Sequence, residues 1–136
     1  MTTDTPIDTF SPEFTATLDQ AKIARIKAAI IAEMRRLKTG VTFIELQRAV
    51  GEEGSGKCAI CAGSNPNIVF WMGMSPEFTE AHNQLHREGF FETHQTQVLV
   101  YMVDGQVPDM PLATSNYKYK EPHWLPVTHS LARRPA

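Results

Sequence analysis

Two cysteines and two histidines near the middle of the chain have the side chains and the spacing of a metal site. Cys58 and Cys61 are separated by two residues in a glycine-rich stretch. His82 and His86 are separated by three residues, so in a helix they would share one face, one turn apart. Two thiolates and two imidazoles suit tetrahedral zinc. The candidate zinc ligands are therefore Cys58, Cys61, His82 and His86.

The same four residues have other interpretations, which the sequence leaves open. The 20 residues between Cys61 and His82 exceed the ~12–15 of the common zinc pattern. The cysteines could be small apolar fillers or free thiols. A reactive C-x-x-C pair is a further alternative, but such pairs usually begin a helix, whereas this one lies in a predicted loop. His82 could be a hydrogen-bonded, half-buried side chain and His86 an exposed one.

Catalytic motifs are missing from the sequence. It contains no Gly-x-Ser-x-Gly elbow, no P-loop and no Gly-x-Gly-x-x-Gly run. Glu52 and Glu53 are adjacent acids beside glycines, a pattern typical of a solvated loop rather than of an acid–base pair. We therefore predict that the protein is not an enzyme and assign no catalytic residue.

Length and composition limit the possible classes of protein. A chain of 136 residues with 42% hydrophobic residues fits one compact domain with tails. The 13 basic residues are outnumbered by 15 acidic ones, which excludes a uniformly basic nucleic-acid coat protein. The start, residues 1–11, lacks the basic and apolar regions of a signal peptide. The apolar run 98–103 is far shorter than the ~20 residues of a spanning helix, so we expect a cytoplasmic protein with no membrane segment.

A long first helix is predicted from Ser11 or Pro12 to about Lys38. Serine can cap the helix, and proline is tolerated in its first turn. The pair Thr39-Gly40 then ends the helix. Apolar residues at steps of three and four predict one buried stripe, made of Ile23, Ile26, Ile30, Met34 and Leu37.

The next segments alternate between regular and irregular patterns. Thr42 and Glu45 have the spacing of a capping box, which predicts a short helix that Gly51 ends. Residues 51–67 are rich in glycine, serine and asparagine and are predicted to be a loop. Residues 67–72 are β-branched or aromatic and predict a short buried strand.

A third helix and a hairpin follow in the sequence. Ser75-Pro76 predicts the start of the helix, and Gly89 its end. Residues 90–94 and 97–103 are two strand-like runs that predict a β-hairpin directly after the helix. Prolines limit regular structure from residue 106 onward, although aromatic residues there predict packing against the body.

This order of elements resembles the winged helix-turn-helix superfamily. In that superfamily a Leu-x-x-x-Gly step ends the third helix and a hairpin wing follows at once. Leu85 and Gly89 match the step, and residues 90–103 match the wing. The resemblance covers residues 22–103, with residues 51–74 longer than the usual connection between the second and third helices. It implies an α+β, winged-helix-like fold with three helices, a long first helix and an irregular C-terminal strap.

The resemblance implies a DNA-binding transcriptional regulator. Its third helix would enter the major groove of double-stranded DNA. Asn and Gln can pair with adenine, and Arg with guanine. The residues expected to contact DNA through that helix are Thr79, Asn83, Gln84 and Arg87. The residues expected to contact phosphate from the first helix are Lys22, Arg25, Arg35, Arg36 and Lys38.

A second function fits the same scaffold. The third helix carries Glu77, Glu80 and Glu88 against one arginine, which matches a polyanion poorly. The alternative is therefore a protein-interaction module or adaptor that does not bind DNA, with or without a structural zinc. The first helix also has apolar residues beside its main stripe that could support a homodimer, namely Ala24, Ala28 and Ile31.

These patterns divide the chain into three parts. Residues 1–11 are predicted to be a flexible tail. Residues 12–104 are predicted to be the winged-helix-like domain, with residues 51–67 as a glycine- and cysteine-rich insertion. Residues 105–136 are predicted to be a C-terminal extension that packs on this domain.

Overall fold

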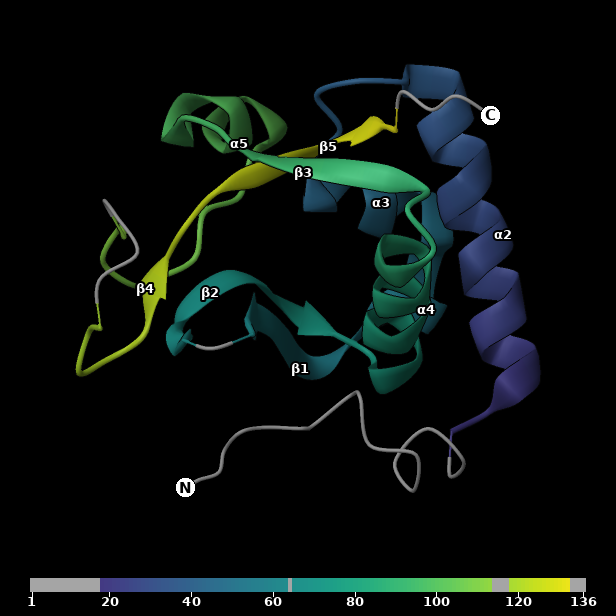
Figure 1. Ribbon diagram of the computed structural model, residues 1–136, viewed down its shortest axis with the longest axis horizontal. Coiled ribbons are helices and arrows are strands. Elements are labelled where there is room, and N and C mark those ends of the chain that lie inside the picture. Colours follow the sequence, from purple (N-terminus) through teal and green to yellow (C-terminus); the bar gives the residue numbers. More distant parts are fainter. Residues whose placement is uncertain (1–17, 64, 114–117, 133–136) are drawn as a thin grey trace.

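The computed structural model describes residues 18–63, 65–113 and 118–132 and shows an α+β fold (Figure 1). The predicted α+β class is therefore confirmed, whereas the predicted tail at residues 1–11 lies outside the described residues. The helices are α2 (Gln20–Leu37), α3 (Phe43–Val50), the single 3-10 turn η1 (Gly51–Gly54), α4 (Pro76–Arg87) and α5 (Val98–Asp104). The strands are β1 (Ser55–Ala62), β2 (Asn65–Met74), β3 (Phe91–Gln95), β4 (His123–Trp124) and β5 (Val127–Leu131).

Helix α2 begins later than the sequence predicts. Asp19 is extended, and its side chain accepts a hydrogen bond of 3.1 Å from the backbone N–H of Lys22. Asp19 therefore caps α2, so this helix does not extend back to the predicted start, and Ser11 and Pro12 themselves lie outside the described residues. The helix ends at Leu37, close to the predicted end. The expected stripe is confirmed at Ile23, Ile26, Ile30 and Met34, which are all buried, while Leu37 is partly buried.

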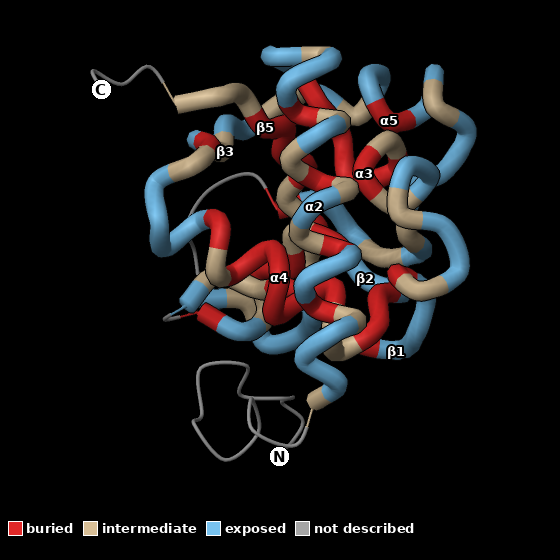
Figure 2. The backbone as a smooth tube through the Cα atoms, turned by 90° about the vertical axis from the view of Figure 1, so that its right-hand side faces the viewer, coloured by how far each residue is buried: buried red, intermediate tan, exposed pale blue. Residues whose placement is uncertain are grey.

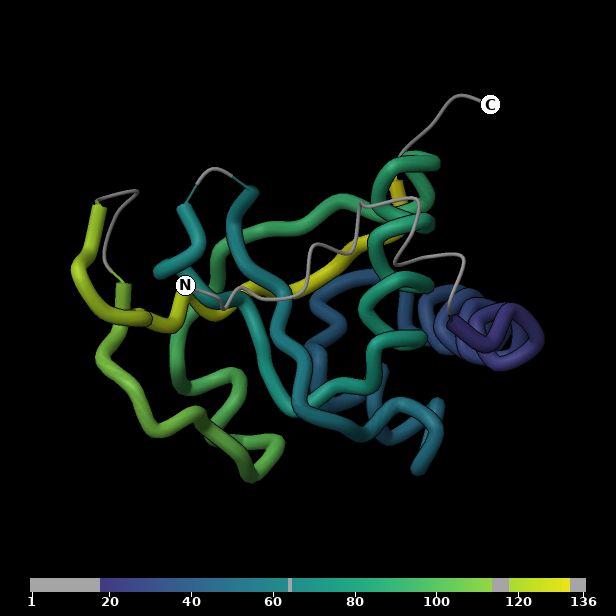
Figure 3. Tube along the Cα trace, turned by 90° about the horizontal axis from the view of Figure 1, so that it is seen from below, coloured from purple at the N-terminus to yellow at the C-terminus, as the bar shows by residue number. Residues whose placement is uncertain are grey.

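Helices α3 and α4 begin where their caps predict. Thr42 and Glu45 form the expected capping box, in which each side chain bonds the other residue's backbone N–H. The Ser75 hydroxyl accepts a hydrogen bond from the N–H of Phe78, and Pro76 occupies the first turn of α4. Helices α2 and α4 pack side by side (Figure 1), and Figure 3 shows α2 nearly along its axis.

The segment predicted as a loop at residues 51–67 is instead η1, strand β1 and the start of strand β2. Strands β1 and β2 are antiparallel, and β4 adds to β2 in parallel to complete a three-stranded sheet. The pairing of β1 with β2 is interrupted by several register shifts. Glycines and small residues in β1 hide the period-2 pattern, so the prediction of a loop is wrong. The expected strand at residues 67–72 is part of β2.

The hairpin predicted at residues 90–103 does not form. Strand β3 pairs with β5, with Phe91 opposite Leu131 and Gln95 opposite Val127. The second expected strand is helix α5, which Gly105 ends in the left-handed conformation at φ 96°. A short apolar run such as residues 97–103 is compatible with a helix as well as with a strand. The choice between the two depends on tertiary contacts, which cannot be read from the local sequence.

The C-terminal extension is part of the fold rather than an irregular strap. Its strands β4 and β5 belong to the two sheets, and Trp124 and Val127 lie in the hydrophobic core. His129 pairs with Val41, between α2 and α3, through two backbone hydrogen bonds of 3.0 and 2.8 Å. Figure 2 shows that the buried segments gather between α2, α3, α4 and β5. The core is therefore closed by residues from both ends of the described chain.

Candidate functional site

Helix α4 does not present the surface expected of a DNA-reading helix. Residues 78–83 are all buried, and six consecutive helical residues point in every direction around the axis. Thr79 is fully buried and Asn83 is 9% exposed. The expectation that these two side chains face outward is contradicted, because other elements cover the first and middle turns of α4, whereas its last turn is exposed at His86 and Arg87.

The other two expected DNA readers on α4 make contacts within the chain. Gln84 donates a 2.9 Å hydrogen bond to the buried Glu80 carboxylate and accepts one of 3.2 Å from the Lys27 ammonium. Arg87 is exposed, and its guanidinium lies 3.4 Å from the same Glu80 oxygen. Lys27 also forms a 2.8 Å ion pair with Glu88. Contacts with neighbouring side chains of the same chain therefore hold both the Gln84 amide and the Arg87 guanidinium.

Most of the cations expected to meet phosphate are paired with acids of the same chain. Lys22 lies 3.4 Å from Glu77 of α4. Arg25 forms a 2.6 Å ion pair with Glu53 of η1. Each exposed pair contributes little stability, about 0–1 kcal/mol, but it also cancels the local positive charge. Helix α2 is thus less basic to an approaching polyanion than its sequence suggests.

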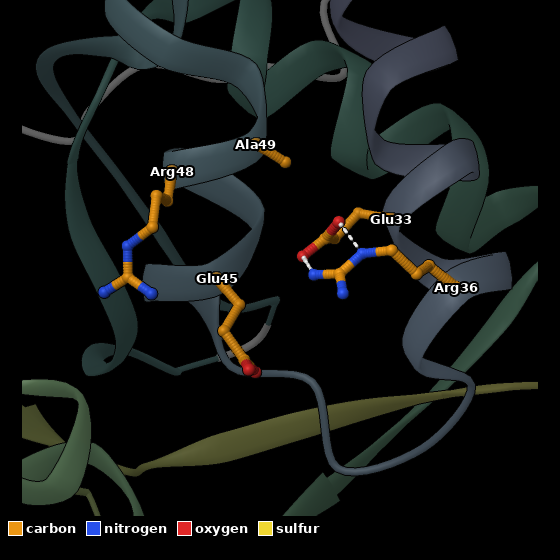
Figure 4. A pocket seen from close by; sticks show the side chains of 5 residues that line it. All are labelled: Glu33, Arg36, Glu45, Arg48 and Ala49. Carbon is orange, nitrogen blue, oxygen red and sulfur yellow. Dashed lines mark hydrogen bonds and ion pairs between the residues drawn. The ribbon is translucent and has the colours of Figure 1, made fainter.

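A pocket between α2 and α3 contains the third of these pairs (Figure 4). Arg36 binds Glu33 through two hydrogen bonds of 3.0 and 2.7 Å. The pocket has a volume of about 220 Å³. Its five lining residues are Glu33, Arg36, Glu45, Arg48 and Ala49. With two acids and two bases, it favours neither an anion nor a cation.

The last two expected phosphate contacts lie at the C-terminal end of α2. The Arg35 guanidinium lies 6.0 Å from the ring centroid of Phe90, within cation–π range. Lys38 is exposed and caps the helix with a positive φ of 73°. Of the apolar residues considered for a homodimer, Ala24 and Ala28 are exposed and Ile31 is half-buried.

The four candidate zinc ligands do not converge. Cys58 and Cys61 lie on β1, opposite Met74 and Val69 of β2. His82 points into the core from α4, whereas His86 is exposed. Across residues 18–63, 65–113 and 118–132, no three His, Cys, Asp or Glu side chains are grouped so that they could hold a metal ion.

Neither cysteine has the surroundings of a reactive thiol. Cys58 is buried and Cys61 is half-buried. Burial raises the pKa of both thiols, and the charge of Glu77 raises the pKa of Cys58 further. The reactive form is the thiolate, so these surroundings oppose the redox interpretation of the C-x-x-C spacing.

A buried pair of histidines lies between α4 and β5. The Nε2 atoms of His82 and His129 are 2.9 Å apart, and His129 Nδ1 lies 2.9 Å from the carbonyl oxygen of Val41. The rings of Phe43 and Phe91 pack against both imidazoles. Burial lowers the pKa of His129 to about 4 and moves the pKa of His82 well below its ordinary value.

This pair was not predicted from the sequence, although a signal for one half of it exists. In the strand Val127–Leu131, alternate residues face the same side, so His129 shares the inward face of Val127. The partner could not be identified from spacing, because His82 and His129 are 47 positions apart in the sequence.

Helix α5 exposes apolar side chains on its outer face. Tyr101 is fully buried and points inward, whereas Leu99 is 62% and Val103 is 78% exposed. The exposed large apolar residues of this region are Leu99, Val100, Met102, Val103, Val107 and Leu112. The sequence analysis missed this surface because it assigned residues 97–103 to a wing strand.

Family models, curated proteins and solved structures were compared with the chain, and none of them matched. In the described part of the chain, no helix combines the length and the apolar character needed to cross a bilayer.

Proposed function

We propose that this protein is an interaction module that binds another protein through the exposed face of α5. The observation that carries the proposal is the continuous apolar surface of this helix. Leu99, Met102 and Val103 are each more than half exposed, on a helix with no charged residue before Asp104. Contiguous exposed apolar patches on soluble proteins commonly mark interaction sites.

The patch is held in place by contacts on the opposite side of α5. The buried Tyr101 hydroxyl donates a 2.6 Å hydrogen bond to the carbonyl oxygen of Val127. Asp104 accepts a 2.7 Å hydrogen bond from the hydroxyl of Thr42. The middle and the C-terminal end of α5 are thereby anchored. A preorganised face loses less conformational entropy on binding, which favours affinity.

The scaffold itself is proposed to be winged-helix-like. Helices α2, α3 and α4 are followed by the antiparallel pair β3 and β5, which resembles the three helices and following wing of that superfamily. Val41 pairs with β5, and β5 pairs with β3, which supports the corresponding small sheet. On this interpretation, β1 with β2 is one insertion, and a segment that includes α5 and β4 replaces the tip of the wing.

DNA binding is the less supported function on this scaffold. DNA affinity depends strongly on cations that neutralise phosphate. Lys22, Arg25 and Arg36 instead neutralise acids of the same chain. The burial of Thr79 and Asn83 also removes two expected base readers from the surface.

DNA binding is tested by titrating the whole protein with duplex DNA at several salt concentrations. We expect no binding at low salt. A log–log slope near −4 to −5 would reveal about five phosphate contacts and would refute the proposal.

The α5 surface is tested by photo-cross-linking inside the cells that make the protein, with a photoreactive amino acid in place of Leu99. We expect one protein partner to cross-link at position 99, and the cross-link to disappear when Val103→Asp is added. Position 72 is a matched control, since Met72 is also an exposed apolar residue, at 42%, but lies on β2. Equal cross-linking at 99 and 72, or none at 99, contradicts the proposal. A cross-linked dimer would identify the partner as a second copy.

A further inference from the structure

We propose that His82 and His129 form an acid-sensitive latch that fastens strand β5 to helix α4. The two imidazoles meet at 2.9 Å with 5% and 0% of their surface exposed. They are brought together from positions 47 residues apart, and they join helix α4 directly to strand β5. The latch does not depend on the proposed function.

The hydrogen-bond pattern fixes where the protons lie in the closed latch. Burial lowers the pKa of both histidines, so both rings are neutral at neutral pH. The carbonyl oxygen of Val41 can only accept, so the Nδ1–H of the neutral His129 donates to it and the Nε2 of His129 is an acceptor. The Nε2–H of His82 therefore donates to His129. This assignment leaves both rings neutral, with the Nδ1 of His82 as a bare acceptor.

The Nδ1 of His82 is the vulnerable point of the latch. This atom is buried and has no hydrogen-bond partner among the described residues. A proton that binds there creates an imidazolium whose new N–H has no acceptor. A proton on the Nε2 of His129 would instead remove the acceptor that receives the His82 N–H. Either event leaves a buried group unsatisfied, which is unfavourable.

The surroundings of the pair offer no compensating negative charge. Phe43 of α3 and Phe91 of β3 contribute aromatic rings. The other titratable groups that act on the pair are His86 of α4 and His94 of β3, and their positive charge would oppose protonation further.

Glu80 of α4 is buried, with Oε2 bonded to Gln84 and with Oε1 lacking a hydrogen-bond partner among the described residues. Its charge is not among the causes that shift the pKa of either histidine. Two further acids lie on neighbouring elements. Glu92 lies 3.6 Å from His94 on the same strand. Glu45 of α3 accepts the backbone N–H of Thr42 in the capping box. At the C-terminal end of α2, the contact of Lys38 with β5 is made by its backbone: the carbonyl oxygen of Lys38 accepts a hydrogen bond from the N–H of Leu131. A proton on the latch would therefore face two imidazoles and aromatic surface.

Opening the latch would release more than two side chains. His129 carries both backbone hydrogen bonds to Val41, and its strand β5 carries the pairing with β3. The carbonyl of Val127, also on β5, receives the Tyr101 hydroxyl that anchors α5. Acid would therefore loosen β5 first and the α5 face with it.

The direction of the pH dependence follows from the two lowered pKa values. Because the closed state holds both rings neutral, the open state binds protons more strongly as the pH falls. The stability due to the latch is complete above about pH 6.5, and it is lost as the pH falls from there toward about 4.

The test is hydrogen exchange of the β5 backbone amides, measured by NMR on the full chain between pH 7.5 and 4.5. For the wild type we expect the equilibrium constant for opening to rise up to about tenfold per pH unit for each histidine. His82→Gln keeps an N–H donor toward His129 but cannot be protonated, so its pH dependence should be weaker. His86→Gln, on the exposed side of the same helix, is the control for loss of a histidine outside the pair. Burial, the largest cause of both lowered pKa values, is unchanged in this variant, so it should keep most of the wild-type pH dependence.

Two outcomes overturn the latch. The first is a wild-type opening constant that does not change with pH, and the second is the same pH dependence in His82→Gln as in the wild type. If His82→Gln does not fold, the proposal is tested instead by the pH dependence of the imidazole NMR signals of His82 and His129 in the native wild type. Titration of His82 or His129 near pH 6.5 then refutes the proposal, whereas the absence of titration above about pH 5 supports it. Neither result depends on finding a partner for α5.

Discussion

The Tyr101 hydroxyl on α5 bonds both the Val127 carbonyl on β5 and the backbone N–H of Phe43 on α3, so it joins three segments of the chain. It donates a 2.6 Å hydrogen bond to that oxygen and accepts one of 3.1 Å from the backbone N–H of Phe43. The phenol ring also packs against Trp71 and Trp124. Helix α5, strand β5 and the first residue of α3 therefore depend on one side chain.

Tyr101→Phe should destabilise the protein by about 2–4 kcal/mol. The substitution keeps the ring but leaves the buried N–H of Phe43 and the carbonyl of Val127 without this partner, and each such group costs about 1–3 kcal/mol. Urea denaturation, with the slope of the transition compared between the two proteins, measures the change. A loss below about 0.5 kcal/mol would show that water or a backbone shift replaces the hydroxyl.

Alkaline pH should destabilise the protein through the same residue. Burial raises the pKa of Tyr101 well above its ordinary value of 10. The native state therefore keeps the proton that the unfolded state loses, so stability is intact below about pH 10 and falls as the pH rises further. Stability measured from pH 8 to 11 should fall more steeply in the wild type than in Tyr101→Phe. Parallel curves would contradict the raised pKa.

Gly56→Ala should cost about 1–3 kcal/mol although Gly56 is exposed. A Cβ at this position would lie 2.7 Å from the carbonyl oxygen of Met74 and 2.7 Å from the Cα of Ser75. Both are backbone atoms, so β1 or the start of α4 would have to move. Gly63→Ala is the control, because a Cβ there meets nothing within 4 Å, and thermal unfolding of the two variants should differ clearly. Equal melting temperatures would show that β1 is free to move.

The two thiols should react slowly in the native protein. Their raised pKa values reduce the thiolate fraction at pH 7.5, and Cys58 is also shielded by burial. Alkylation by iodoacetamide, followed by mass spectrometry, should be at least about tenfold slower than in the urea-denatured chain, and Cys61 should react before Cys58. Fast labelling of Cys58 in the native state would contradict its place in β1.

Local signals in the sequence predicted the helices better than the sheets. The Thr42 capping box and the Ser75-Pro76 start depend on residues only a few positions apart, and both are confirmed. The buried stripe of α2 has the same local character. The start of α2 was predicted too early, because the search for a cap selected Ser11 and passed over Asp19, which caps the helix.

The sheets and the buried histidine pair depend on contacts between distant residues. Strand β3 was predicted to pair with the next apolar run, but its partner β5 begins 32 residues after the end of β3. The burial of Asn83 could not be foreseen either, because a polar residue on a predicted helix is normally assigned to the solvent. The outward face of α4 was thus predicted from the polarity of its side chains alone, without knowledge of the elements that pack around the helix.

The pairing of Val41 with His129 also has a consequence for the order of folding. Contacts between residues 88 positions apart close slowly, since a long loop must be ordered before any of them forms. During synthesis, α2, α3 and α4 emerge well before their closing strand, and their apolar faces stay uncovered until β5 arrives. A nascent chain stopped before Val127 should therefore be recognised by chaperones, whereas one extended beyond Leu131 can complete its core.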